Sequence, residues 1–71
     1  MTDWPAYAKG IMRSEMTRKG LSYADLVKAL DGMGVKESEA NLRNKVSRGS
    51  FTAAFLFQCM SAMGVKTLHL D

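Results

Sequence analysis

The sequence predicts a single all-α domain of four helices, residues 1–71, ending in a short strand-like tail. Apolar residues recur three or four positions apart in four successive stretches, which is the period of a helix with one buried face. A helix-capping residue precedes each stretch and a glycine follows it, as expected where helices begin and end. The connections span about two to four residues, which is typical of a compact helical bundle.

The first helix is predicted over residues 5–19. Asp3 is a favourable N-cap, and Pro5 suits the first turn because no intrahelical partner exists there for the N–H that proline lacks. Met12 lies on an apolar stripe with four-residue spacing. Gly20 ends the helix, because glycine readily adopts the left-handed conformation of a C-terminal cap.

The second helix is predicted over residues 23–33. Ser22 and Asp25 are three positions apart, which is the spacing of a capping box with Asp in place of the usual Glu. The buried stripe of this helix is predicted to contain Leu26, Ala29, Leu30 and Met33. Two glycines near the end of the segment indicate where the helix stops.

The third helix is predicted over residues 37–48, and its two sides differ in character. Leu42 and Val46 are four positions apart and form an apolar side together with Val35. The opposite side carries amides, a small residue and basic residues, and Gly49 ends the helix. The apolar side is therefore expected to pack on the core and the polar side to face outward.

The polar side of this third helix has the composition of a surface that enters the major groove of DNA. Asn pairs bidentately with adenine, Ala contacts the thymine methyl group, and Arg reaches guanine or phosphate. The amides and Arg48 would read bases, and the lysines and Arg43 would position the DNA by its phosphates. The candidate DNA-binding residues are Lys36, Ala40, Asn41, Arg43, Asn44, Lys45 and Arg48. A polar face that is merely solvated is the alternative interpretation.

The fourth helix is predicted over residues 52–63, with Ser50 or Thr52 as its N-cap and Gly64 beyond its end. Apolar residues cover more than half of its circumference, which indicates a central place in the core or an interface. Methionines on the apolar stripes are expected to fill the core, with an adaptable partner surface as the alternative. The predicted core comprises Leu26, Leu30, Leu42, Val46, Phe55 and Cys59.

The tail, residues 65–71, alternates apolar and polar residues, which is the period of a strand. A single strand needs a partner, and the chain offers no second one. Two interpretations stay open: a disordered tail or one that packs on its own domain, and a strand that pairs with its copy in a homodimer. The dimer interface would contain Leu68, Leu70 and Met60.

The net charge, the cysteine content and the lack of long apolar stretches restrict the classes of protein to which the chain can belong. The net charge of +3 and the pI near 9.3 are compatible with an anionic partner. The single cysteine leaves no possibility of an intrachain disulfide. Because no signal peptide and no apolar stretch of about 20 residues are apparent, we expect a cytoplasmic protein without a membrane partner.

The chain lacks the residue constellations of catalysis. Cys59 and His69 are the only cysteine and the only histidine, and two such residues do not complete a tetrahedral metal site. Nucleophilic catalysis needs a nucleophile, a base and an orienting group, and the glycines form no phosphate-binding loop. We therefore expect no enzymatic activity, no metal, no cofactor and no small-molecule substrate.

Two resemblances follow from these motifs. The segments KGLSYADLVKAL and KVSRG, and the later run ending in MGV, resemble the lambda-repressor-like helix-turn-helix domains of the Cro and Xre type over roughly residues 11–65. The spacing from Leu26 to Gly49 is longer than in that pattern, so groove-facing residues are carried over by helix face and not by position. The order GLS, GVKE, NKVSRG and FTAAF is also similar to a small uncharacterised bacterial domain family of unknown function, over nearly the whole chain.

The helix-turn-helix resemblance implies a small transcriptional regulator that binds double-stranded DNA sequence-specifically, as a homodimer on a two-fold site. The alternative is a protein-interaction module of the same fold, which would use the apolar face of the fourth helix and the tail. Salt dependence separates them, because DNA binding weakens steeply with salt whereas an apolar interface does not.

Overall fold

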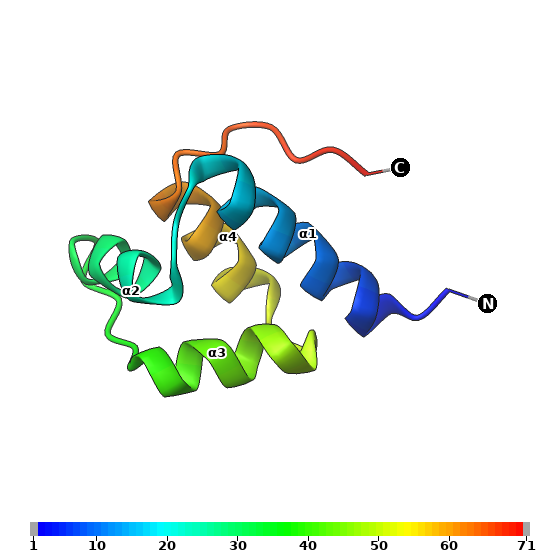
Figure 1. The fold of residues 1–71 in the computed structure, drawn as a ribbon, viewed down its shortest axis with the longest axis horizontal. Coiled ribbons are helices and arrows are strands. Elements are labelled where there is room, and N and C mark those ends of the chain that lie inside the picture. The colour runs from blue at the N-terminus through cyan, green and yellow to red at the C-terminus, as the bar shows by residue number, and fades with distance from the viewer. Residues whose placement is uncertain (1, 71) are drawn as a thin grey trace.

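The computed structural model describes residues 2–70, and the regular structure within that range is entirely helical. Figure 1 shows the helices in chain order, followed by a tail that runs back past α1. The helices are α1 (Trp4–Lys19), α2 (Tyr23–Asp31), α3 (Glu39–Arg48) and α4 (Ala53–Ala62). The prediction of an all-α fold with four helices is confirmed.

Each helix begins at a side chain that accepts a hydrogen bond from the backbone N–H three residues further on, at 3.0–3.1 Å. These caps are Asp3, Ser22, Ser38 and Thr52. In α2 the capping is reciprocal, because the Asp25 carboxylate accepts a 3.0 Å hydrogen bond from the Ser22 N–H. The capping roles expected of Asp3 and Ser22 are confirmed, and Thr52 is the cap among the two candidates for α4.

The connection between α2 and α3 is longer than expected from the sequence. Helix α2 ends at Asp31, where the chain turns through Gly34 (φ +81°), and the Val35 N–H donates to the Leu30 carbonyl at 3.0 Å. Helix α3 begins two residues later than predicted, because the Ser38 side chain caps it. Val35 and Glu37 therefore lie in this connection, and their expected places on the third helix were wrong.

The core lies between the helices and is rich in methionine. All six predicted core residues are buried, so that prediction is confirmed. Met33 was expected on the buried stripe of α2, but it lies beyond the end of that helix and is 45% exposed. The buried apolar side chains are Met12, Met16, Leu26, Leu30, Leu42, Val46, Phe55, Cys59, Met60 and Met63.

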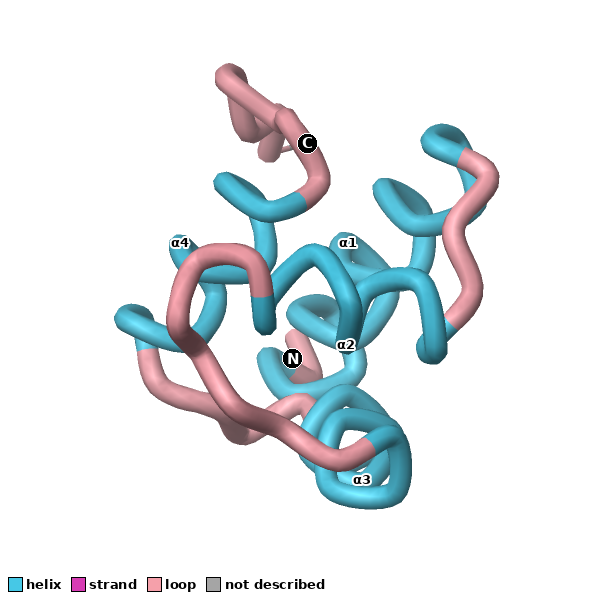
Figure 2. The backbone as a smooth tube through the Cα atoms, turned by 90° about the vertical axis from the view of Figure 1, so that its left-hand side faces the viewer, coloured by secondary structure: helices cyan, strands magenta, loops and turns pink. Residues whose placement is uncertain are grey.

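The N-terminal end of α1 meets the C-terminal end of α3 at a contact between backbones. Gly49 caps α3 in the left-handed conformation (φ +68°) and is buried. A Cβ atom at this position would lie 1.9 Å from the carbonyl oxygen of Pro5, so only glycine permits the approach. In Figure 2, α3 is seen end-on at one edge of the molecule, and the C-terminal tail lies at the opposite edge.

The tail forms no strand within the described residues, so the strand-like tail was wrong. The Val65 N–H donates to the Met60 carbonyl at 2.9 Å, which closes the end of α4. Val65 and Leu68 then pack against the core, whereas Leu70 is 66% exposed. Alternation alone did not produce a strand, because no neighbouring strand supplies hydrogen bonds. Residue 71, the end of the predicted tail, lies outside the described residues.

Candidate nucleic-acid interface

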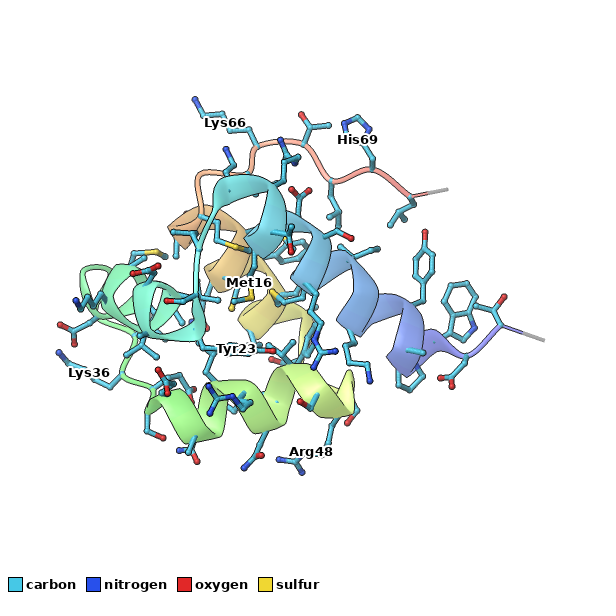
Figure 3. The ribbon with its side chains drawn as sticks, viewed as in Figure 1. Met16, Tyr23, Lys36, Arg48, Lys66 and His69 are labelled. Atoms are coloured by element: carbon cyan, nitrogen blue, oxygen red, sulfur yellow. The ribbon has the colours of Figure 1, made fainter. Side chains whose placement is uncertain are left out.

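The outer face of α3 is polar and accessible along the length of the helix. Leu42 and Val46 are fully buried, and they hold the helix on the core by its opposite face. Arg48 projects away from the other helices in Figure 3. Four of the seven candidate DNA-binding residues, Ala40, Asn41, Asn44 and Arg48, lie on this helix and are all exposed without an ion pair among the described residues.

The two asparagine side chains on this face are available to a partner. Asn41 contributes its backbone N–H to the Ser38 cap, but the side-chain amides of Asn41 and Asn44 form no hydrogen bond with any described residue. Arg48 likewise forms no ion pair within residues 2–70. An exposed amide presents both donors and an acceptor, which is the pattern that reads the edge of adenine.

The three cations expected to hold phosphates are each paired with a carboxylate. Lys36 pairs with Asp31 across the turn after α2. Arg43 lies 3.5 Å from the Glu39 carboxylate, one turn away on α3. Lys45, the third of them, pairs with Glu37. The sequence indicated that these cations lie on or beside α3, but it did not reveal the carboxylates with which they pair.

Lys45 is the most enclosed of the three cations. Its Nζ lies 2.6 Å from Glu37 Oε2, and the Glu37 side chain is only 11% exposed. The same ammonium lies 4.8 Å from the centre of the Phe55 ring, so it also makes a cation–π contact with α4. These contacts join the connection before α3, α3 itself and α4, which indicates a structural role for Lys45.

Arg43 joins α3 to the start of α2. Its guanidinium carbon lies 5.1 Å from the centre of the Tyr23 ring. A cleft of about 400 Å³ opens beside this contact, and Arg13 of α1 and Glu39 lie on its walls. The cleft therefore lies where α1, α2 and α3 meet.

Cys59 of α4 is fully buried, and its thiol is unreactive near neutral pH. Burial raises the pKa of its thiol to about 12, and the nearby negative charge of Glu37 adds to the effect. The thiol therefore stays protonated near neutral pH, and a protonated thiol is neither a nucleophile nor a metal ligand. No group of three His, Cys, Asp or Glu side chains that could hold a metal ion occurs in the described part of the chain.

A second surface lies between α1, α4 and the tail and is apolar. It is a groove of about 420 Å³, and Trp4 and Leu70 on its walls are 67% and 66% exposed. Leu68 is half-buried in this groove. Met60, the third residue predicted for a dimer interface, is 5% exposed and lies in the core. Its side chain consequently has little surface left for a partner.

Among residues 2–70, none of the helices is both long enough and apolar enough to cross a membrane. A comparison with curated proteins found no match, and a comparison with solved structures found none either. Residues 4–68 match the family described as "Domain of unknown function (DUF6471)". This match covers almost the entire chain and bears out the resemblance to a small uncharacterised domain family. The chain belongs to this family.

Proposed function

We propose that this domain binds double-stranded DNA sequence-specifically through the outer face of α3, as a small transcriptional regulator of the helix-turn-helix type. The observation that carries the proposal is a set of unpaired polar side chains, Asn41, Asn44 and Arg48, on one exposed helix face. The other face of the same helix is fixed in the core by Leu42 and Val46. Such a helix presents its polar groups rigidly, as base recognition requires.

The dimensions of α3 support the same proposal. A helix of 10 residues is about 15 Å long, and the major groove of DNA is about 12 Å wide and admits one helix. Asn41 and Asn44 would pair with adenine edges, and Arg48 would reach guanine or a phosphate. Binding, and no catalytic step, is the role proposed for these residues.

The test is selection of DNA sites from randomised duplexes, followed by affinity measurements with two variants. The double variant Asn44→Ala/Arg48→Ala should bind the selected site at least about 30-fold more weakly, because it removes two base-reading side chains and each bidentate base contact is worth about 1–3 kcal/mol. Lys66→Ala is the control, since it removes one cation from the tail on the side opposite α3 (Figure 3). If no DNA site is enriched, the proposal is wrong. If the double variant and the control bind the selected site with equal affinity, α3 is not the surface that recognises the bases.

The apolar groove favours a second candidate function, which is a protein-interaction module. Trp4 and Leu70 expose large apolar surfaces there, and such surfaces often mark protein interfaces. A second copy of the chain is one possible occupant, and the expected homodimer stays a prediction. Sedimentation of the full chain and of a chain truncated after Gly64 checks it, because the truncation removes Leu68 and Leu70.

A further inference from the structure

The pairing of the expected phosphate contacts leaves a different set of cations for an anionic partner. Lys36, Arg43 and Lys45 each already have a carboxylate partner. A cation that must leave a carboxylate gains less from a phosphate than one that is solvated alone. The basic residues without an ion pair in the described chain are Lys9, Arg13, Lys19, Lys28, Arg48 and Lys66.

Two of these cations lie on the side of α1 that faces α3. Arg13 lines the cleft whose other walls include Glu39 and Arg43 of α3. Lys9 is four residues earlier in α1, so it lies on the same side one turn away. Tyr7 and Ile11 lie on the opposite side of α1, because they line the apolar groove against the tail.

Helices α1 and α3 run in opposite directions, and this arrangement places Lys9 and Arg13 of α1 alongside α3. Gly49, after the end of α3, contacts Pro5 at the start of α1. Glu39, at the start of α3, lines the cleft with Arg13. Lys9 lies between these two points on α1. Lys9 and Arg13 thus flank α3 along most of its length.

The major groove is about 12 Å wide, so its edges lie about 6 Å from a helix axis at its centre, and a second helix packed with its axis about 8–10 Å away lies beyond one of those edges. A helix in that groove therefore brings a flanking helix to the backbone of one DNA strand. The charges in this area are two unpaired cations and the weakly held pair of Arg43 and Glu39, so the flank carries net positive charge.

We propose that Lys9 and Arg13 of α1 bind the sugar–phosphate backbone of one DNA strand while α3 occupies the adjacent major groove. This proposal rests on the proposed DNA binding, and it assigns to α1 the phosphate contacts that were expected of Lys36, Arg43 and Lys45. Lys9 and Arg13 carry no base-reading role, since phosphate contacts position a protein and do not specify sequence.

The test is the salt dependence of binding to duplex DNA of random sequence. Each phosphate contact contributes about 0.9 to the slope of log Kobs against log salt concentration. The double variant Lys9→Gln/Arg13→Gln should lower the magnitude of that slope by about 1.8 between about 50 and 200 mM salt. The single variant Arg13→Gln, at an exposed position, should lower it by about 0.9 and covers the case in which the double variant does not fold.

The matched control is Lys28→Gln/Lys66→Gln, which removes the same charge from exposed positions on α2 and the tail. Its slope should stay close to that of the wild type. If the wild type binds DNA but the Lys9/Arg13 variants and the control have equal slopes, the backbone contact on α1 is wrong while DNA binding stands. If the wild type shows no salt-dependent binding to DNA, both proposals are wrong.

Discussion

Replacing Gly49 by alanine should destabilise the domain far more than the same change at Gly20. Both glycines cap a helix with φ +68°, so an alanine at either position incurs the strain of a left-handed conformation, about 1–2 kcal/mol. Nothing lies within 4 Å of a Cβ at Gly20. At Gly49 the new Cβ would lie 1.9 Å from the Pro5 carbonyl oxygen. The difference between the two variants therefore isolates the contact between α1 and α3.

The magnitude follows from the distances. Ordinary contacts of a Cβ atom are 3.4–4 Å, so α1 and α3 would have to separate by about 1.5 Å at Gly49. Forcing such a shift on a packed domain costs roughly 1–3 kcal/mol beyond the conformational strain. Gly49→Ala should thus lower the free energy of unfolding by about 2–5 kcal/mol, a large share of the stability of a domain this small.

Thermal unfolding followed by circular dichroism measures both variants under the same conditions. A domain of this size loses roughly 4–8 °C in Tm for each kcal/mol, so Gly49→Ala should melt roughly 8–40 °C below the wild type. Gly20→Ala, which incurs the conformational strain alone, should melt roughly 4–16 °C below it. Free energies of unfolding that agree within about 0.5 kcal/mol for the two variants would show that the approach of Gly49 to Pro5 does not constrain the fold.

Two further predictions concern the core beneath α3. Phe55 is 5% exposed and contacts both Phe51 and the Lys45 ammonium. Phe55→Ala should therefore lower the free energy of unfolding, measured with urea, by about 3–5 kcal/mol. A decrease below about 1 kcal/mol would show that Phe55 lies outside the core. Burial raises the pKa of Cys59 from 9.0 to about 12, so the native state holds its proton where the unfolded state releases it. The free energy of unfolding should consequently fall as the pH rises from about 9 toward 12, and Cys59→Ala should flatten that slope. A thiol reagent that modifies Cys59 in the native state as fast as in denaturant would contradict this burial.

Local signals along the chain determined the helices. The caps at Asp3 and Ser22 bond to N–H groups three residues away, so both partners stand in one short segment of the sequence. The pairs Leu26/Leu30 and Leu42/Val46 showed which side of α2 and α3 is buried. In each case the interaction is decided within one or two helical turns, and its pattern is therefore visible without the fold.

The tertiary structure decided which cations of the candidate interface are paired with carboxylates. Glu37 and Lys45 are eight residues apart and belong to a connection and a helix, so no helical spacing indicates their ion pair. Lys45 and Phe55 belong to different helices, α3 and α4, and meet only in the folded chain. Sequence reasoning consequently identified exposed cations near α3, but it could not tell which of them already had a carboxylate.

The sequence alone determined four capped helices, a core of the predicted composition and a polar face on α3, because each depends on neighbours within a few residues. The tertiary structure decided that the tail is not a strand, since a strand depends on hydrogen bonds from a distant segment. It also decided that α1 lies against α3, through a contact between Gly49 and Pro5 that residue types do not reveal. Contacts between segments far apart in the chain arise only when the helices pack, and they determine which charges remain free for a partner.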